Sequence, residues 1–542
     1  MLIRGLFLPL LSILFPSYVK IRWTPDSSGS TLMSGILGKV LEFRQQIGPG
    51  NLTVLCLIMV EVVGLLWLFP YLPMTDLPEH MLQANILAHY DAPGMHYADF
   101  FSKKFPWNPY SSYFWFVYSL SRIACVISAT RLYIALSLMS TILAFAFWLR
   151  NAAPAHLAQL LPGTLLLFGF FFYLGAVNFL FSIPFLFLSL AAAEKICSRP
   201  ETDHRLEALL CFALLGAYFS HVFTFVLAVL SIGWQCFLCR RGRQMISILR
   251  GSLLPLTISV IYLASQAAAD TVSVSWTYEP LIARFEKLLL PFNAFRDAAD
   301  NRWVFQPEFV SIWIAVFVLL IAGTIGVTGK LARKPEWRRP LPALCLFAGA
   351  SVLLPSFFSN GMPFAMRAAY PAAFCLLAMI PPGWARNRAL RAAMYVACLG
   401  APLLLAYRLA GFQQEVRELQ QVITAIPKGK VLQPVITEPQ SSFFQNYPFL
   451  HAAAWYNFVR GGTSPYLFSK QPHFPVREKK SPIVSPPGEW QMNQFKYSRN
   501  QAGTEFFLVR TSRQDILEDL GKHVPLFAEA GGWRVFGPNP SH

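Results

Sequence analysis

The chain has 542 residues, of which 55% are hydrophobic and only 13% charged, and its formal net charge is +17. Soluble proteins usually carry about a quarter charged residues. Uncharged apolar runs of about 18 residues or more recur along this sequence, and runs of that length are typical of membrane-spanning helices. The composition therefore excludes an ordinary soluble domain and predicts a polytopic α-helical membrane protein in a lipid bilayer.

The positive charge is concentrated in short links between apolar runs, at 239–250, 330–339 and 384–391. Basic residues gather in this way in loops on the cytoplasmic side of a membrane. No nucleic-acid-binding motif accompanies them, so we expect no nucleic-acid partner.

Taken in chain order, residues 1–51 are expected to form a cytoplasmic or interfacial N-terminal segment. A transmembrane domain of about 11 helices follows over residues 52–411, with outer loops at 71–109 and 269–307. The spans are predicted at 52–70, 110–129, 131–149, 157–174, 178–195, 207–238, 251–268, 309–329, 341–356, 371–382 and 392–411.

The run 207–238 is too long for one straight span of about 20 residues. It could be one tilted helix or a short hairpin that turns near Ser220 and His221. Counting it once places the three basic links on the same side and the C-terminus on the outer side, so we favour that interpretation.

Two regions outside the predicted spans have sequence patterns that indicate secondary structure. Residues 82–90 have the pattern of a short amphipathic helix that lies along the membrane interface. Residues 412–542 are predicted to form a small extracytoplasmic α/β domain. Its strands are expected in "VLQPVI" (431–436), "TEFFLVR" (504–510) and "WRVFG" (533–537), with a helical link over 512–532.

The stretch "MTDLPEH" (74–80) places three titratable side chains directly after the first span: Asp76, Glu79 and His80. One interpretation is structural, since Thr75 or Asp76 could cap a helix that begins here, and Asp76 could also be a solvated loop residue. The functional interpretation is that Asp76 is a general base for an acceptor hydroxyl. Glu79 or His80 would then orient it, bind the acceptor, or hold a divalent cation with it.

Other polar residues lie beside or within apolar segments. Arg367 could bind the phosphate of a lipid-linked donor, with Lys287 and Arg284 as further cations. Alternatively, Arg367 extends to the lipid headgroups, and the two cations of the outer loop are solvated.

Asn178 and His221 lie near or inside the predicted bilayer, where polar groups are often functional but also hydrogen-bond between helices. Glu61, in the first span, could pair with Arg122 for purely structural reasons.

The architecture resembles the GT-C glycosyltransferases, which are polytopic enzymes that use polyprenyl-phosphate sugars. The resemblance lies in an aspartate in the first outer loop, an interfacial helix, many spans and a C-terminal outer domain. "DLPEH" (76–80) further resembles a group of bacterial polytopic membrane proteins of uncharacterised function. Four other motifs contribute to that second resemblance: "YLGAVNF" (173–179), "YFSHVF" (218–223), "RAAYP" (367–371) and "RGGTSPYLF" (460–468).

The resemblance implies a glycosyltransferase that moves a sugar from a polyprenyl-phosphate carrier to an extracytoplasmic glycan or lipid acceptor. Asp76 matches the acidic residue that serves as the base in the GT-C superfamily. The lipid-linked sugar would be the donor substrate, no metal site is implied, and a divalent cation could be present. The protein would lie in the bacterial inner membrane with its C-terminal domain in the periplasm. The residues expected to bind substrate are Glu79, His80, Asn178, His221, Lys287 and Arg367.

Two other functions remain open from the sequence. A transporter or flippase for a lipid-linked or anionic solute would use an intramembrane polar path made of Glu61, Arg122, Asn178 and His221. A non-catalytic partner in envelope polysaccharide assembly would need none of these groups.

Overall fold

The computed structural model describes most of the chain from residue 42 to residue 538, and expectations for residues 1–41 lie outside it. Parts of the loop 269–307 also lie outside the described residues. The described ranges are 42–104, 108–239, 242–267, 275–296, 303–305, 309–327, 339–358, 362–471, 474–479, 482–483 and 486–538.

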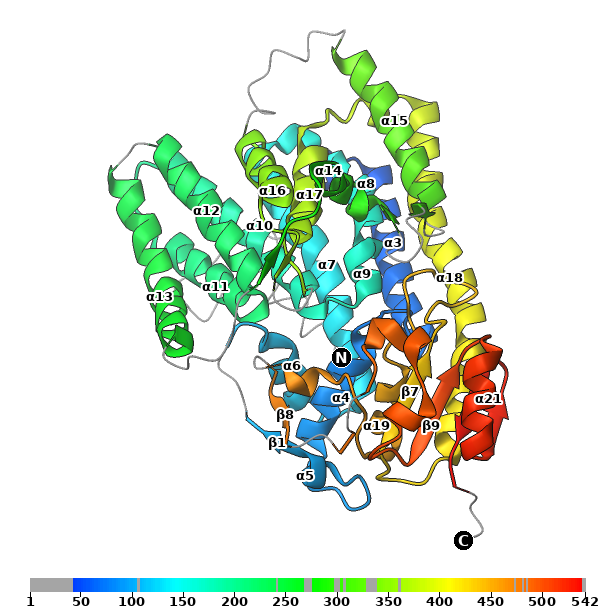
Figure 1. Ribbon diagram of the computed structural model, residues 1–542. Coiled ribbons are helices and arrows are strands. Elements are labelled where there is room, and N and C mark those ends of the chain that lie inside the picture. The colour runs from blue at the N-terminus through cyan, green and yellow to red at the C-terminus, as the bar shows by residue number, and fades with distance from the viewer. Residues whose placement is uncertain are drawn as a thin grey trace, which may run out of the picture.

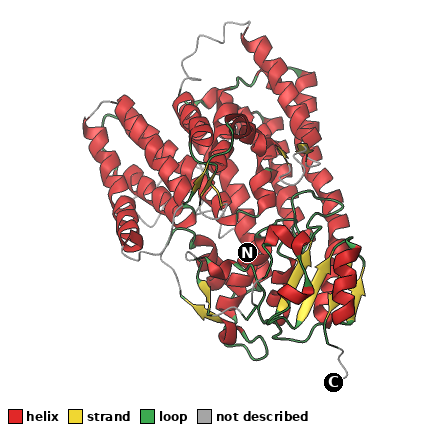
Figure 2. Cartoon of the chain, in the orientation of Figure 1, coloured by secondary structure: helices red, strands yellow, loops and turns green. Residues whose placement is uncertain are grey.

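The protein is a multi-pass helical membrane protein with a small sheet domain at one end of the bundle (Figures 1 and 2). Six segments among the described residues are long and apolar enough to cross a bilayer, and shorter apolar helices lie between them. The six lie in α3 (Pro49–Leu68), α7 (Val126–Ala152), the broken run Pro154–Leu174, α10 (Val177–Ser198), α13 (Gly242–Ala267) and α18 (Arg388–Ala425). The shorter ones are α12 (Val222–Cys239), α15 (Phe309–Val327), α16 (Leu341–Leu353) and α17 (Ala369–Met379).

Exposed apolar side chains on the outer helices agree with a lipid environment. Val260 and Leu263 of α13, Phe317 of α15 and Leu403 of α18 are all more than half exposed. Soluble proteins rarely expose contiguous apolar faces of this kind, whereas lipid chains cover them without cost.

The predicted span 110–129 is wrong. The chain there forms α6 (Ser112–Leu120), whose nine residues rise only about 13 Å, and a bilayer core is about 30 Å thick. The crossing is made instead by α7, a single helix of 27 residues that begins at Val126.

The single span favoured for 207–238 is also wrong, and the hairpin alternative is right. Helix α11 (His204–Ser220) ends before His221, whose backbone is extended, and α12 begins at Val222. At one end of the bundle the Ser247 hydroxyl of α13 bonds to Glu207 near the start of α11. At that same end, Glu194 of α10 and Gln235 of α12 line one cavity. The chain therefore reverses direction at His221.

The loss of the predicted span 110–129 removes one membrane crossing, and the hairpin of α11 and α12 adds one. The C-terminal domain therefore still lies at the same end as the loop 71–109, as expected (Figure 1). Described residues of two basic links lie at the opposite end, where Arg339 donates to the Asn151 carbonyl at 3.1 Å and Trp384 donates to Gln159 at 3.3 Å.

The C-terminal domain is α/β, as predicted. Its sheet has the order β10-β11-β9-β7, in which β7 and β9 are parallel and the other pairs are antiparallel. The predicted helical link 512–532 also contains a strand, β10, and the boundary predicted at 411/412 falls inside α18, which continues without interruption. The elements are β7 (Leu432–Ile436), α19 (Ala452–Arg460), β9 (Phe506–Arg510), α21 (Gln514–His523), β10 (Leu526–Ala530) and β11 (Trp533–Phe536).

The C-terminal domain packs directly on the first outer loop. Strand β1 (Phe101–Lys103) pairs with β8 (Val476–Glu478) in antiparallel register. Helix α4 (Leu77–Ala88) lies between α6 and α7 on one side and α19 on the other, and residues 77–87 are all buried. The prediction of an interfacial amphipathic helix over 82–90 is therefore wrong, because protein covers the helix on both sides.

The remaining elements are short and connect these parts. Those before the second outer loop are α5 (Tyr97–Phe100), η2 (Pro154–Gln159), α8 (Leu160–Leu165), η3 (Leu166–Phe168) and α9 (Phe170–Leu174). Those of the outer segments and links are β2 (Trp276–Thr277), α14 (Leu281–Glu286), η4 (Lys287–Phe292), β3 (Ala294–Arg296), β4 (Trp303–Phe305), β5 (Phe357–Phe358), β6 (Met362–Pro363), η7 (Ala365–Ala368) and η8 (Gly383–Ala385). Those of the C-terminal domain are η9 (Phe468–Lys470), η10 (Glu489–Gln494) and α20 (Tyr497–Asn500).

Candidate functional site

Asp76 stands at the N-terminus of α4, where the sequence predicted a helix start. Pro78 lies in the first turn, as it often does, because a proline there loses no helical hydrogen bond. The Asp76 side chain makes no capping hydrogen bond, so its carboxylate is not used to close the helix. Its backbone N–H donates to the Leu174 carbonyl at 2.9 Å, and that of Thr75 donates to the Tyr173 carbonyl at 2.9 Å.

The "YLGAVNF" motif fixes the backbone of Asp76. Gly175 has a φ of +80°, and a Cβ at this position would lie 2.9 Å from the Leu77 nitrogen and 3.0 Å from the Asp76 nitrogen. Only glycine combines that backbone conformation with so close an approach. Gly175 thus allows the segment 173–179 to pack against the backbone of the first outer loop, although the two segments lie far apart in sequence.

Asn446 of the C-terminal domain holds the same two segments together. Its amide Nδ2 donates to the Pro73 carbonyl at 2.6 Å and to the Tyr173 carbonyl at 3.0 Å, and the Thr75 hydroxyl donates to the Asn446 carbonyl. All three of these bonds are buried. The position of Asp76 is therefore set jointly by the first outer loop, the segment 173–175 and the C-terminal domain.

The Asp76 carboxylate faces a histidine of the C-terminal domain. The Asp76 Oδ1 lies 3.4 Å from His451 Nε2, and His451 Nδ1 lies 3.0 Å from Glu489 Oε1. The side chains of Asp76, His451 and Glu489 are 26%, 6% and 20% exposed, respectively. Burial opposes protonation of His451, but Glu489 and Asp76 outweigh it and raise the pKa of the imidazole well above its ordinary value. His451 is therefore an imidazolium between two carboxylates at neutral pH.

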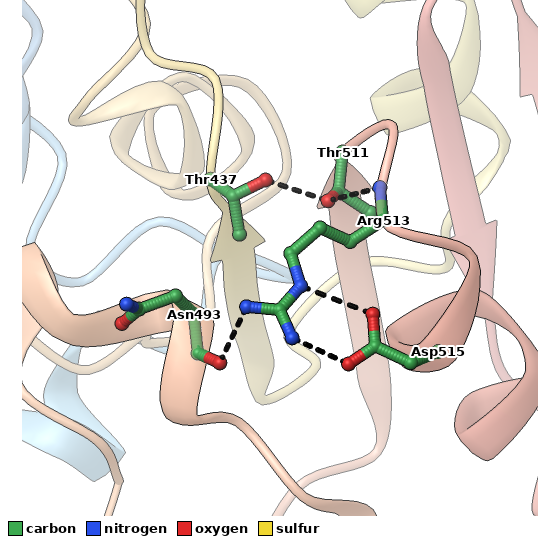
Figure 3. Close-up of polar contacts among 5 residues, drawn as sticks. All are labelled: Thr437, Asn493, Thr511, Arg513 and Asp515. Atoms are coloured by element: carbon green, nitrogen blue, oxygen red, sulfur yellow. Dashed lines mark hydrogen bonds and ion pairs between the residues drawn. The ribbon is translucent and has the colours of Figure 1, made fainter.

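Glu489 belongs to η10, and Asn493 at the other end of η10 contacts the segment after β9 (Figure 3). The Arg513 guanidinium donates to the Asn493 carbonyl of η10 at 3.1 Å and to Asp515 at 3.0 Å. Thr511, after β9, bonds with Thr437, after β7, at 2.6 Å. The Arg513 bond therefore joins the end of η10 to the segment after β9.

Glu79 is buried one turn after Asp76. Its Oε2 accepts the backbone N–H of Phe468 at 3.0 Å, and its side chain has almost no exposure. Burial raises the pKa of Glu79 to about 7, aided by the nearby carboxylates of Glu489 and Asp76 and opposed by His451 and the Phe468 N–H. Glu79 therefore joins the first outer loop to the "RGGTSPYLF" segment, and acceptor binding by Glu79 stays a prediction.

His80 is buried among aromatic rings. Tyr113, Phe114, Phe468 and Phe474 surround it at ring-centroid distances of 5.6 to 6.3 Å. Burial lowers the pKa of His80 to about 4, although Asp76 opposes that shift. His80 is consequently neutral at pH 7, and its predicted role in acceptor binding also stays a prediction.

Arg367 lies in η7, immediately before α17, and interacts electrostatically with both Tyr110 and Asp76. The structure thus brings this predicted phosphate-binding cation toward the predicted base. Lys287 begins η4, which packs against η7. Its ammonium lies 3.2 Å from Glu279 and 5.9 Å from the centre of the Phe357 ring, so its described contacts are with the outer segments.

Asn178 and His221 meet at Tyr110. Asn178 Nδ2 donates to the Tyr110 carbonyl at 3.1 Å, while its Oδ1 accepts from the Ser112 hydroxyl and the Tyr113 N–H, each at 3.1 Å. The His221 ring packs edge-on against Tyr110 at a centroid distance of 4.9 Å. The hydrogen bonds of Asn178 are the interhelical kind that the sequence left open, and substrate binding by either residue stays a prediction.

The polar path of the transporter alternative is not continuous among the described residues. Arg122 is exposed, donates to the Tyr118 hydroxyl at 2.5 Å and lies 4.9 Å from the centre of that ring. No ion pair between Glu61 and Arg122 occurs in the described part of the chain, and Glu61 Oε2 has no hydrogen-bond partner there.

His451 and Glu489 were not among the site residues predicted from the sequence. His451 precedes a short alanine-rich helix, and a lone histidine in that setting is indistinguishable from a core residue. Glu489 follows a run rich in proline and serine and has no motif around it. Across the described ranges, no group of three or more His, Cys, Asp or Glu side chains is arranged to hold a metal ion.

No protein-family model matches the chain, and no curated protein matches it. Two solved structures do. One is ArnT from Cupriavidus metallidurans in the apo state, with a TM-score of 0.53, 12% identity and coverage of 90% of this chain and 97% of that chain. The other is ArnT from the same organism bound to undecaprenyl phosphate, with a TM-score of 0.54, 12% identity and coverage of 90% and 98%. The chain therefore shares the fold of ArnT over 90% of its length.

Proposed function

We propose that this protein is a membrane glycosyltransferase that moves a sugar from a polyprenyl-phosphate carrier to an extracytoplasmic glycan or lipid acceptor. Its fold is that of ArnT, one structure of which is bound to undecaprenyl phosphate. Residues for the proposed reaction come from the first outer loop, η7 and the C-terminal domain, which the folded chain brings together.

The placement of Asp76 is the observation that carries this proposal. Its side chain is about a quarter exposed, whereas Glu79, three positions later, is almost fully buried. A general base must reach the acceptor hydroxyl, and a nearby cation must reach the donor phosphate. The partial exposure of Asp76 supports the first condition, and its electrostatic interaction with Arg367 supports the second.

The proposed reaction is a single displacement. Asp76 takes the proton of the acceptor hydroxyl while the hydroxyl oxygen attacks the anomeric carbon of the sugar. The bond from that carbon to the phosphate oxygen breaks, and the carrier leaves as a phosphate with one more negative charge. The Arg367 guanidinium stabilises that charge, and Lys287 adds a second cation from the neighbouring η4.

In this scheme the remaining predicted residues lie close to the two substrates. His80 and Glu79 lie on the acceptor side beside Asp76, while His221 and Asn178 lie with Tyr110 near the phosphate. We further propose that the protein lies in the bacterial inner membrane with its C-terminal domain in the periplasm. No step of the scheme uses a metal ion.

The test is mass spectrometry of envelope glycans and lipids from cells that carry the wild type, a deletion, or Asp76→Asn at equal protein level. Removing a general base costs about 10²- to 10⁴-fold in rate, so we expect one defined sugar to be lost in both altered strains. Asp91→Asn is the matched control, because Asp91 is a carboxylate of the same outer loop that is 82% exposed. Normal glycans in Asp76→Asn cells would reject Asp76 as the base.

A further inference from the structure

His451 joins two carboxylates that come from different parts of the chain. Its Nε2 faces Asp76 at the start of α4, and its Nδ1 faces Glu489 at the start of η10. We propose that His451, oriented by Glu489, is a positioning residue that keeps the Asp76 carboxylate ionised and aimed at the acceptor hydroxyl. This inference rests on the proposed function, and it assigns the C-terminal domain a direct part in the reaction.

The geometry fixes the ring of His451. Both nitrogens lie close to a carboxylate oxygen, and an ionised carboxylate accepts a hydrogen bond only from a ring nitrogen that carries a proton. An imidazole with two N–H groups is a cation. The ring also packs edge-on against Phe468 at a centroid distance of 5.4 Å. Because the side chain is only 6% exposed, little water competes for these contacts.

Three acidic groups and one further histidine face His451. Asp76, Glu79 and His80 come from α4, and Glu489 comes from η10. His80 is neutral at pH 7, so His451 is the cation of this group. Asp76 also interacts electrostatically with the Arg367 guanidinium. His451 is the cation on the side of the C-terminal domain, and without it Asp76 would stand beside Glu79 and Glu489, whose like charges favour protonation. His451 therefore offsets part of the repulsion among these carboxylates.

His451 keeps both of its protons throughout the proposed reaction. The acceptor proton moves to Asp76, and the electron pair of the broken sugar–phosphate bond moves to the carrier phosphate. His451 contributes only charge and orientation. A loss of that charge should therefore change the protonation of Asp76 itself, and this quantity can be measured without knowing the sugar.

The experiment is a pH titration of the full-length protein in nanodiscs by infrared difference spectroscopy, with no substrate added. The carboxyl band of Asp76 is identified as the band that disappears in Asp76→Asn. His451→Gln and His451→Phe remove the cation with different side-chain shapes, so one can serve if the other does not fold. We expect the midpoint of the band to rise by at least one pH unit in either variant, which is a tenfold change in the protonation equilibrium.

Two further variants separate charge from packing. His451→Arg keeps a cation, so it should restore the wild-type midpoint. His96→Gln removes a histidine that pairs with Asp99 at 2.9 Å in the same outer loop but is half exposed, and it should leave the midpoint unchanged. An unchanged or lower midpoint in His451→Gln and His451→Phe would overturn the proposal. So would an equal rise in His451→Arg, because packing would then be the cause.

The same variants distinguish this inference from the proposed function. A shifted midpoint with normal envelope glycans in Asp76→Asn cells would reject the glycosyltransferase reaction while leaving the effect of His451 on Asp76 in place. An unshifted midpoint, with the sugar lost in Asp76→Asn cells, would reject only the role of His451.

Discussion

Two acids of one helical turn lie in different surroundings. Asp76 is partly exposed and faces an imidazolium, whereas Glu79 is buried and accepts a single backbone N–H. Pairs of carboxyl groups with unlike surroundings can take unlike roles in one site. Asp76 is suited to exchange a proton with a substrate, and Glu79 is suited to join the first outer loop to the C-terminal domain.

Glu79 should make the stability of the protein depend on pH. Its pKa is raised from 4.5 to about 7 in the folded protein, so the native state retains its proton over a range in which the unfolded chain has lost it. Stability from this group is therefore complete below about pH 4.5 and is lost as the pH rises through 7. The full loss is on the order of 3 kcal/mol.

The Glu79→Gln variant tests this pH dependence, because a glutamine oxygen can still accept the Phe468 N–H but cannot ionise. We expect thermal unfolding in nanodiscs to show the variant gaining stability relative to wild type between pH 5 and pH 8. A stability difference that stays constant over that range would show that the ionisation of Glu79 is not linked to folding.

Asp76 could be predicted as a candidate site residue from the sequence, because it is the first acidic residue after the first span. It could not locate His451 or Glu489, because their meeting with Asp76 depends on how the C-terminal domain docks. That docking depends on contacts such as Asn446 with Pro73 and Phe468 with Glu79, which link distant segments. No local pattern records such contacts.

At the scale of elements, hydropathy predicted apolar segments but not what covers them. In α6, Tyr113, Phe114 and Val117 are fully buried against protein, so the segment is apolar without being a membrane span. Helix α4 was misjudged for the same reason. The reversal at His221 occurs without a glycine or proline at the turn, so the run 207–238 gave no signal that separates a hairpin from a tilted helix.

Gly175 provides a test of how the loops position Asp76. In Gly175→Ala, the new Cβ would press on the backbone nitrogens of Asp76 and Leu77, and the left-handed φ would also be strained. A displacement of about 1 Å at a reacting group can cost about 10²-fold in rate. We expect transfer of the sugar to fall by that order, with a lower unfolding temperature.

Gly64→Ala is the matched control for this change. Gly64 lies within α3, and a Cβ there would meet nothing within 4 Å. Replacing a helical glycine with alanine is usually neutral or stabilising. Equal activity in the Gly64→Ala and Gly175→Ala variants would show that the approach of residues 173–175 does not position Asp76.

At the scale of the whole molecule, α18 links the helical bundle to the C-terminal domain in one continuous helix of 38 residues (Figure 1). The domain returns from the end of α18 to the first outer loop, where β8 pairs with β1. The class of the protein, the α/β nature of the domain and the end of the bundle at which it lies were predictable from composition and charge. The enclosure of the site between two distant parts of the chain was not.

The arrangement predicts opposite sides for the two ends of the bundle. An epitope inserted after Gly532, in the exposed turn before β11, should be reached by antibody on intact spheroplasts. One inserted after Glu201, in the exposed link between α10 and α11, should be reached only after the membrane is opened. Detection of both epitopes on the same side would contradict the proposed orientation.

The most direct measurement of Asp76 as the base is the amount of polyprenyl-phosphate sugar in lipid extracts of cells that carry wild type or Asp76→Asn at equal protein level. We predict that the carrier-linked sugar accumulates in Asp76→Asn cells while the same sugar disappears from the envelope acceptor. An unchanged carrier-linked pool together with a normally modified acceptor would contradict that assignment.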